Sequence, residues 1–407
     1  MRGRGSGGRL ALLRALPGTL VARFKRLVKR QPAPLVVPDA GGNGRGRGTK
    51  SALLVYLPRA FPLSEDDEQL LTHQNLICCR TMAAVIGEFG YTVDVIDKRN
   101  KEFLPKRDYD LIISERLDWN GVERLFPPEA THVFLATSLC HTLHNRNVRR
   151  RHELLSERGR DPIMIRRVYG ETMPAVHAAN AVTGVGNAFT MGTWSEVYDG
   201  PIHPFDNFAF PGTRSVSDHK DFEAARRRFL FFASRSQIQK GLDLLLEIFP
   251  RHPELELYVC SQFELEPDFC TVYERELFHT PNVHAVGMVP VNGEQFYELA
   301  RSCANVIHPS CSDGQAGSVV QCMAAGLVPL VSRETGIDVD GFGLQFADDG
   351  LEEIERAILD VAGRPTAWHE TQSALSRRAA EGQFSLDAFT ARWREILTEI
   401  LAADQHA

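Results

Sequence analysis

The chain has 407 residues, of which 43% are hydrophobic and 24% are charged. These proportions are ordinary for a globular protein of two or three domains, and they exclude a disordered, fibrous or collagen-like chain. No apolar run reaches the roughly eighteen residues that cross a bilayer, and the eight cysteines form no CxxC pair. We therefore expect neither a membrane-spanning protein nor a disulfide scaffold, and a reducing, cytoplasmic location fits best.

The first 50 residues differ in charge from the rest of the chain. They carry 12 lysines and arginines and one acid, a net charge of +11, whereas the remaining 357 residues carry −17. Within residues 9–30, the stretch 20–30 places apolar residues at helical spacing with basic residues on the other face, which is typical of a helix lying on an anionic membrane surface. A flexible extension, a mitochondrial transit peptide and, less favoured, a nucleic-acid-binding tail are the alternatives. Residues 1–50 are therefore set apart as a basic extension.

From residue 51 short apolar strands alternate with helical stretches. The helical spacing of apolar residues predicts a helix over 76–89 that ends at Gly90. The predicted strands are 51–57, 92–97, 111–114, 132–137 and 181–185. This alternation predicts a parallel sheet covered on both faces, and residues 51–217 are assigned to a first domain.

A second alternating series begins after the polar segment 211–228, in which we place the domain boundary. The predicted strands are 229–234, 255–260, 283–289, 305–310 and 327–332, and the predicted helices are 241–249 and 294–304. Residues 218–383 therefore form a second domain, and 384–407 hold a C-terminal amphipathic helix. The predicted fold is α/β, with two doubly wound, Rossmann-like domains facing a central cleft, where ligands of such sheets bind.

The first candidate segment begins where a predicted strand ends, at Ser234. Arg235 follows directly, and Lys240-Gly241 opens the next helix. The helix N-terminus adds unpaired N–H groups and a partial positive charge to these two cations. The segment therefore predicts a site for an anion such as a diphosphate, although a solvated basic loop would have the same composition.

The second candidate segment, residues 308–332, joins two strands through a small-residue turn and a helix. Asp313 and Gln321 stand eight residues apart on either side of the turn. Small residues between them leave backbone amides open to a close-approaching ligand, notably at Gly314, Gly317 and Ser318. A tight strand–turn–helix connection with glycines for packing is the structural alternative.

Together these segments resemble the C-terminal half of the retaining GT-B glycosyltransferases of family 4, the glycosyl transferases group 1. The family pattern of strand, Gly-Arg, four residues, Lys-Gly and helix here reads Ser234-Arg235 followed by Lys240-Gly241. The pattern continues with Pro-Ser, an acid, seven residues and Glu-Ala-Met-Ala-x-Gly. Here it reads Pro309-Ser310, Asp313 and Gln321-Cys322-Met323-Ala324-Ala325-Gly326. The resemblance spans about residues 228–395, and the first half resembles the family only in layout.

The resemblance implies a role for each matched residue. Arg235 and Lys240 would bind the donor's diphosphate and stabilise the charge that develops on it. The amides around Gly314–Ser318 would support the phosphates or the sugar. Asp313 stands where the family has a glutamate that holds sugar hydroxyls, and Gln321 where a second glutamate binds the ribose. Asp is one methylene shorter, and Gln loses the charge while gaining an NH₂ donor. These two departures imply an altered donor or an inactive relative.

The first domain would bind the acceptor. In the family a histidine just beyond an N-domain strand reaches the donor sugar, and 132–145 offers His141, with His144 behind it. The family's glycine-rich loop after the first strand is absent, and Pro58-Arg59-Ala60-Phe61-Pro62 stands there instead. The C-terminal helix would pack back across the first domain.

The sequence therefore predicts a retaining, hexosyltransferase-type enzyme that uses a nucleotide-diphosphate sugar. The acceptor would be a saccharide or lipid-linked saccharide of cell-surface polysaccharide assembly. No cofactor and no metal are expected, and Asp338-Val339-Asp340 and Asp108-Tyr109-Asp110 are interpreted as solvated carboxylates rather than a metal-binding Asp-x-Asp motif. The alternative function is a catalytically inactive nucleotide-sugar-binding or scaffold protein, which the Glu-to-Gln departure at Gln321 would favour.

Overall fold

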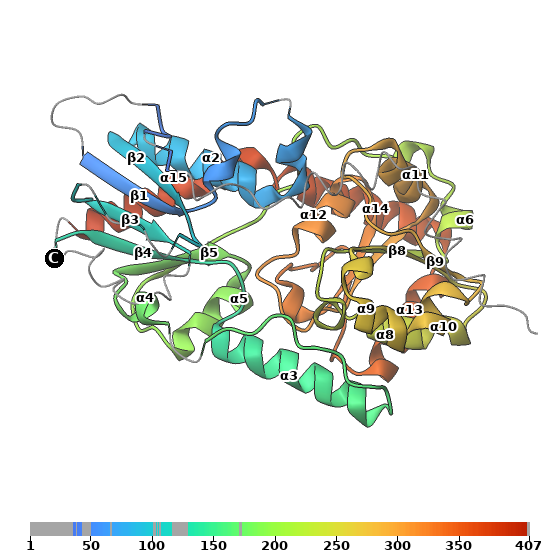
Figure 1. Ribbon diagram of the computed structural model, residues 1–407. Coiled ribbons are helices and arrows are strands. Elements are labelled where there is room, and N and C mark those ends of the chain that lie inside the picture. Colours follow the sequence, from blue (N-terminus) through green and yellow to red (C-terminus); the bar gives the residue numbers. More distant parts are fainter. Residues whose placement is uncertain are drawn as a thin grey trace, which may run out of the picture.

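The computed structural model describes residues 36–37, 39–42, 50–65, 67–100, 103, 105, 107–115, 129–170 and 173–404. The helix predicted within residues 9–30 and most of the basic extension lie outside the described residues. The described chain forms two domains, each around a six-stranded parallel sheet (Figure 1). The predicted fold class is therefore confirmed.

The N-terminal sheet has the order β2-β1-β3-β4-β5-β6, with every neighbouring pair parallel. Its strands are β1 Lys50–Tyr56, β2 Tyr91–Asp97, β3 Leu111–Ser114, β4 Thr131–Ala136, β5 Ala181–Val185 and β6 Ile202–Phe205. Every residue of β3 and β4 is buried, as apolar runs in a sheet with both faces covered must be. The strand order reverses between β1 and β3, which makes that position the switch point of this sheet.

The α-helices of this domain are α2 Gln74–Glu88, α3 His141–Glu157, α4 Pro174–His177 and α5 Ala188–Gly192. Helix α2 ends just before Gly90, whose φ of 86° is the left-handed conformation that terminates many helices. Helix α3 extends from this domain along the second one (Figure 1). Its Arg151 donates to the carbonyl of Pro309 at 3.3 Å, and Arg158 just beyond it pairs with Asp243 at 2.6 Å.

The C-terminal sheet has the order β12-β11-β10-β7-β8-β9, which is the doubly wound Rossmann order. Its strands are β7 Arg228–Phe232, β8 Glu256–Cys260, β9 Val283–Ala285, β10 Asn305–His308, β11 Val328–Val331 and β12 Leu344–Gln345. Its α-helices are α6 Phe222–Ala225, α7 Gln237–Lys240, α8 Leu242–Ile248, α9 Pro267–Val272, α10 Glu274–Phe278, α11 Glu294–Ser302, α12 Gly317–Ala324, α13 Leu351–Gly363 and α14 Thr366–Glu381. The switch point lies between β7 and β10.

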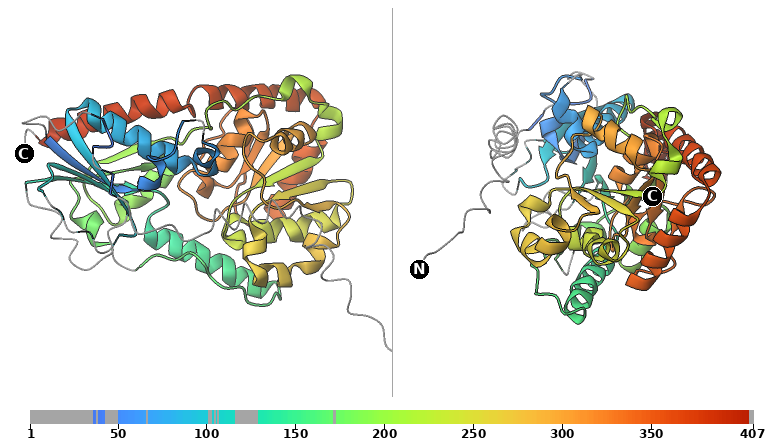
Figure 2. Two further views of the ribbon diagram at one scale, coloured as in Figure 1. Left: turned by 45° about the horizontal axis from the view of Figure 1, so that its top comes forward. Right: turned by 90° about the vertical axis from the view of Figure 1, so that its right-hand side faces the viewer.

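The last helix, α15 Leu386–Asp404, returns to the N-terminal domain. Figure 2 shows α14 and α15 running along one side of both domains. The Trp393 side chain is fully buried, and it packs with Phe389 of α15 against Phe205 of β6. The amphipathic pattern of residues 384–397 thus buries its apolar face against the first domain.

Several elements differ from the sequence expectation, among them strands β6 and β12 and helix α3. Strands β6 and β12 were not predicted, because β6 contains Pro204 at the sheet edge and β12 has only two residues. Helix α3 begins at His141 and was not predicted, because its arginines interrupt the apolar period. The predicted boundary at residues 217–218 falls between β6 and β7. Among the described residues no helix is both long and apolar enough to cross a membrane.

The carboxyl ends of the two sheets meet where the domains touch. Leu139, after β4, donates its backbone N–H to the carbonyl of Asp313, after β10, at 3.1 Å. Thr190 of α5 donates its hydroxyl to the carbonyl of Gly314 at 3.1 Å. A Cβ on Gly314 would lie 2.7 Å from the carbonyl oxygen of Thr137, so only glycine permits this approach. The two candidate segments therefore face the first domain.

Candidate active site

The two candidate segments follow the central strands β7 and β10. These strands are hydrogen-bonded neighbours at the switch point, so the loops after them emerge side by side. Lys240 is the last residue of α7, which follows β7, and Asp313 lies five residues beyond His308, the end of β10. Residues 73 positions apart in sequence are thereby brought into contact.

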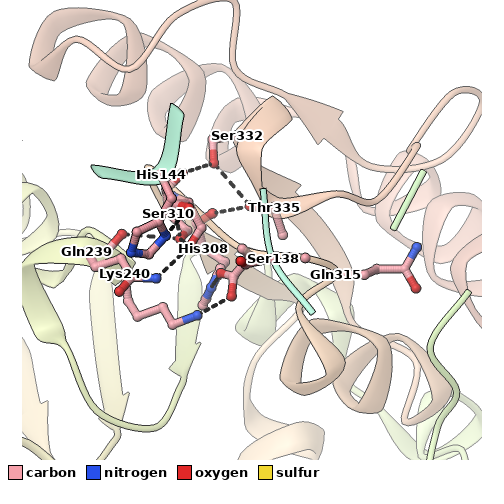
Figure 3. A network of polar contacts seen from close by, with 12 residues as sticks. Ser138, His144, Gln239, Lys240, His308, Ser310, Gln315, Ser332 and Thr335 are labelled. Carbon is pink, nitrogen blue, oxygen red and sulfur yellow. Dashed lines mark hydrogen bonds and ion pairs between the residues drawn. The ribbon is translucent and has the colours of Figure 1, made fainter. Parts of the chain in front are cut away.

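Lys240, Asp313 and His308 form a buried polar cluster, of which Figure 3 labels Lys240 and His308. The Lys240 ammonium donates to Oδ1 of Asp313, and Nε2 of His308 lies 3.2 Å from Oδ2 of the same carboxylate. The side chains of Lys240, Asp313 and His308 are 8%, 12% and 1% exposed, respectively. A buried ammonium and a buried carboxylate tolerate desolvation only as a hydrogen-bonded pair, which explains why the two residue types occur together.

The electrostatics keep the Asp313 carboxylate ionised. Burial alone would raise the pKa of Asp313, but the Lys240 ammonium and the hydrogen bond from His308 hold that pKa well below its usual range. Burial lowers the pKa of Lys240, and Asp313 opposes this shift. Burial also lowers the pKa of His308, so the imidazole is neutral at pH 7. A carboxylate with so low a pKa is a poor general base, so its chemistry is to orient ligands and to hold Lys240.

The turn before Lys240 is engaged by a carboxylate of the same chain. Ser236 has a φ of 71°, and the backbone N–H groups of Ser236 and Gln237 both donate to the buried carboxylate of Glu266. The N-terminus of α7, a helix not predicted from the sequence, is therefore capped internally. Gly241 also has positive φ, and a Cβ there would lie 2.3 Å from the carbonyl oxygen of Pro309, which explains the glycine of the Lys-Gly pair.

Ser234 and Arg235 lie at the exposed edge of this cluster. The Arg235 guanidinium makes one hydrogen bond, from Nε to Oε1 of Gln262 at 3.3 Å, and it forms no ion pair with the described residues. Its charge is therefore available to a ligand, in contrast to that of Lys240.

The N-terminus of α12 supplies the backbone donors. Gly317 and Ser318 are the first two residues of the helix, and among the described residues their N–H groups have no backbone acceptor. Gln74 of α2 covers Gly317, with its Nε2 at 3.4 Å from the glycine carbonyl. The first domain thus reaches the start of this helix.

Gln321 is fully buried, and both of its polar atoms are engaged. Its Oε1 accepts the N–H of Phe210 at 3.0 Å, and its Nε2 donates to Thr213 and to Asn292, each at 2.8 Å. These partners lie on the connection between the domains and on the loop before α11. In the structure Gln321 therefore ties these segments to α12, and the role toward a ribose stays a prediction.

The two candidate histidines occupy different positions. His141 is buried beside Trp194, with ring centroids 6.4 Å apart. His144, one turn further along α3, places Nδ1 2.7 Å from the hydroxyl of Ser312, directly before Asp313. The structure thus brings His144 into contact with the second segment, and a role of His141 toward a donor sugar stays a prediction.

Sequence reasoning missed His308, Gln239 and Glu266. His308 directly precedes the Pro-Ser motif, which is a usable signal, and Gln239 directly precedes Lys240 and donates to the carbonyl of Ser312 at 2.6 Å. Glu266 gives no local signal, because it lies 30 residues from the turn that it caps.

Carboxylates of the two Asp-x-Asp sequences have protein partners. Asp338 accepts from Asn187 at 2.6 Å, and Asp110 accepts the backbone N–H of Ser51 at 2.6 Å. The described part of the chain contains no group of three or more His, Cys, Asp or Glu residues placed to hold a metal ion. That transfer needs no metal stays a prediction.

Comparison with known proteins agrees with this architecture. Residues 226–363, about a third of the chain, match the family described as glycosyl transferases group 1. The match includes both candidate segments. No curated protein sequence matches the chain.

Solved structures of the same fold cover most of the chain. A sucrose-phosphate synthase from Thermosynechococcus elongatus superimposes with a TM-score of 0.59 at 12% identity, covering 87% of this chain and 100% of its own. HepE from Anabaena in complex with UDP-glucose gives 0.56 at 13% identity, covering 86% and 100%. WaaG, a glycosyltransferase involved in lipopolysaccharide biosynthesis, gives 0.50 at 14% identity, covering 86% and 99%. The chain therefore has the GT-B fold of two Rossmann-like domains.

Proposed function

We propose that the protein is a retaining glycosyltransferase that moves a sugar from a nucleotide-diphosphate sugar to a hydroxyl of a saccharide or lipid-linked acceptor. The observation that carries the proposal is the Lys240–Asp313–His308 cluster at the switch point of the C-terminal sheet. Its residues come from the segments that match the glycosyl transferases group 1 family. Beside it lie Arg235, which forms no ion pair with the described residues, and the N-terminal amides of α12, next to Gln74. Both groups suit a diphosphate.

In the proposed reaction, the cations and the backbone amides of the site act on the donor's diphosphate. Arg235 and the amides of Gly317 and Ser318 bind the diphosphate. The buried Lys240 ammonium, held in place by Asp313, adds its positive charge to this site. The bond between the anomeric carbon and the β-phosphate oxygen breaks, and the acceptor oxygen bonds to that carbon from the same face. The acceptor proton passes to the departing phosphate oxygen, and the nucleoside diphosphate leaves. Positive charge held at the phosphate stabilises the transition state more than the ground state.

The donor and acceptor classes draw support from the structural neighbours. HepE is in complex with UDP-glucose, and WaaG is described as acting in lipopolysaccharide biosynthesis. We extend these classes to the present chain as a nucleotide-sugar donor and a saccharide acceptor of surface-polysaccharide assembly. We also propose that residues 9–30 bind an anionic membrane at the cytoplasmic face. Deleting residues 1–48 should abolish binding to anionic vesicles and spare catalysis, and unchanged vesicle binding would refute this anchor.

The decisive experiment compares Arg235→Ala with the unmodified protein. Thermal shift with UDP, GDP, ADP and CMP and their sugar conjugates first identifies the nucleotide, because a ligand that binds only the folded state raises the Tm. Donor hydrolysis without acceptor is then measured with that sugar nucleotide. Arg235→Ala should lower the hydrolysis rate by about 10²–10³-fold, as loss of a charge-stabilising donor does elsewhere.

The matched control is Arg356→Ala on α13, whose side chain is 69% exposed and pairs only with Glu353 among the described residues. Both variants remove an exposed guanidinium, so both should melt like the parent. Equal hydrolysis by the two variants would reject the site assignment.

The second candidate is a non-catalytic nucleotide-sugar-binding protein. It is favoured by the complete engagement of Gln321 and by the internal pairing of Lys240. Tight nucleotide binding together with no donor hydrolysis over many hours would select it.

A further inference from the structure

The N-terminal domain carries a second charged cluster, at the carboxyl ends of its own sheet. Arg59 follows β1, Lys98 follows β2 and Glu115 follows β3, so all three lie around the switch point between β1 and β3. Open α/β sheets bind ligands at this position. None of these residues takes part in the donor site described above.

Lys98 has an internal partner for its charge. Its ammonium pairs with the buried carboxylate of Glu115 and lies 5.6 Å from the ring centroid of Tyr56. Glu115 also accepts from the hydroxyl of Thr137 at 2.8 Å, after β4. This ion pair therefore holds both side chains in place at the carboxyl ends of β1 to β4, and its net charge is close to zero.

Arg59 has no such partner among the residues that the structure describes. Its Nε is buried without a hydrogen-bond acceptor, whereas buried donors in folded proteins are normally satisfied. Burial lowers the pKa of Arg59, Arg99 lowers it further, and Asp97 opposes both. A buried, unsatisfied guanidinium nitrogen at a switch point indicates a missing anionic ligand.

Arg167 brings a second unmatched charge from the segment after α3. It is exposed, and it forms no ion pair with the described residues, while its carbonyl is 3.3 Å from Nε2 of His144. Its charge contributes to the lowered pKa of both His73 and Lys240. Because His144 contacts both the Arg167 carbonyl and the Ser312 hydroxyl, the backbone of Arg167 lies near the second candidate segment.

His73, at the start of α2, reports the positive potential of this region. Its pKa is lowered to about 4 by desolvation and by Arg59, Lys98 and Arg167, and Glu115 opposes the shift only weakly. Desolvation is the largest cause of this shift, and the three cations add to it, so His73 lies in a region of positive potential. Arg59 and Arg167 add two unmatched positive charges to the neutral Lys98–Glu115 pair.

We propose that this cluster, formed by Arg59, Arg167 and Lys98, binds a phosphate group of the acceptor substrate. The inference rests on the proposed function, since it names the acceptor class of the same transferase. Two unmatched guanidinium groups suit a phosphate, which carries up to two negative charges and accepts bidentate hydrogen bonds. The acceptor is therefore a phosphorylated saccharide, either soluble or attached to a lipid through its phosphate.

The experiment measures phosphate binding to the full-length protein saturated with the nucleotide that stabilises it most. Because the nucleotide occupies the donor site, the probes can bind only elsewhere, including at the N-terminal cluster. The probes are inorganic phosphate and glucose 6-phosphate. Glucose and glucuronate are the controls. Isothermal titration calorimetry at fixed ionic strength should show that both phosphates bind and that glucose does not. Arg59→Ala and Arg167→Ala should each weaken phosphate binding at least about tenfold, the loss expected for a charge-assisted hydrogen bond.

Arg356→Ala is the matched control and should leave phosphate binding unchanged. If Arg59→Ala fails to fold, the exposed Arg167→Ala carries the test alone. Phosphate binding that is absent, or that both variants leave unaltered, overturns the proposal, and so does glucuronate binding as tightly as glucose 6-phosphate. The failure of the proposed function has a separate signature, because then no nucleotide stabilises the parent protein.

A second arm identifies the source of the phosphate. Binding of the nucleotide-saturated protein to phosphatidylcholine vesicles is compared with and without phosphatidylinositol, using protein that lacks residues 1–48 so that the basic extension does not contribute. Vesicle binding that needs phosphatidylinositol and Arg167 supports a lipid-linked acceptor. Binding of glucose 6-phosphate alone supports a soluble one, and loss of both responses contradicts the inference.

Discussion

The two sheets present charged clusters at equivalent switch points, but the clusters differ in how their charges are matched. After β7 and β10, the Lys240 ammonium is buried against Asp313. After β1 and β3, Lys98 is paired with Glu115, while Arg59 has no carboxylate partner among the described residues. A matched buried pair makes a rigid platform whose loss destabilises the fold. Cations without a carboxylate partner can instead bind the negative charge of a ligand.

The difference separates structural from functional effects of mutation. Removing one member of a buried ion pair leaves the other charge desolvated, which is costly. Removing an unmatched cation lowers the repulsion among the neighbouring cations, and it leaves no buried carboxylate without a counter-ion. Variants of Lys240 or Asp313 should therefore lose stability and activity together, whereas variants of the unmatched Arg59 or Arg167 should lose only ligand binding.

The largest effect is expected for Lys240→Met. This change leaves the Asp313 carboxylate buried without its counter-ion, so the free energy of unfolding should fall by about 3–5 kcal/mol. Donor hydrolysis should fall by roughly 10²–10³-fold, because the charge near the departing phosphate is lost. Urea denaturation gives the first quantity and a steady-state assay the second.

The double variant Lys240→Met/Asp313→Asn distinguishes the two losses. It removes both charges, so most of the stability should return while hydrolysis stays low. Recovery of hydrolysis together with stability would mean that Lys240 acts only through the fold, which would contradict its proposed catalytic role.

Sequence reasoning reached further in the second domain than in the first. The Lys-Gly and Pro-Ser segments are short and contiguous, and each follows a clearly apolar strand, so the meeting of Lys240 with Asp313 follows from the doubly wound topology. Arg59 and Arg167 are 108 positions apart and belong to no contiguous motif. Both act on the pKa of His73, and the position of Arg167 depends on the path of α3 and the segment after it, which the local pattern did not predict.

Gln321 illustrates a different limit of sequence reasoning. Its place in the motif suggested contact with a ribose, and the structure surrounds it with Phe210, Thr213 and Asn292. These partners are 29 to 111 residues away, so no local pattern indicates that the amide already has acceptors and donors. Its amide nitrogen gives a physical reason for the departure from glutamate, because a carboxylate would donate to neither Thr213 nor Asn292.

An intermediate effect is therefore expected for Gln321→Glu. The buried carboxylate would face Oδ1 of Asn292 and lose two donated hydrogen bonds, so stability should fall by about 1–3 kcal/mol. Nucleotide affinity should not improve. Tighter nucleotide binding with unchanged thermal stability would instead support contact between residue 321 and the ribose. It would also mean that the protein does not need the hydrogen bonds that Gln321 makes in the structure.

The smallest effect concerns the titration of His73, whose pKa should change when a neighbouring unmatched cation is removed. The folded-state pKa, about 4, lies below the ordinary value for histidine, near 6.5, so any contribution of His73 to stability is fully present above about pH 6.5 and is lost as pH falls toward 4. Because His73 is exposed, solvent screening keeps this contribution small. Removing a neighbouring cation favours the imidazolium, so Arg59→Ala and Arg167→Ala should each raise the pKa of His73 toward its ordinary value. Imidazole chemical shifts followed by NMR between pH 3 and 8 give this pKa. The Arg356→Ala control should leave the pKa of His73 unchanged, and a pKa that neither Arg59→Ala nor Arg167→Ala alters would contradict the positive potential inferred around His73.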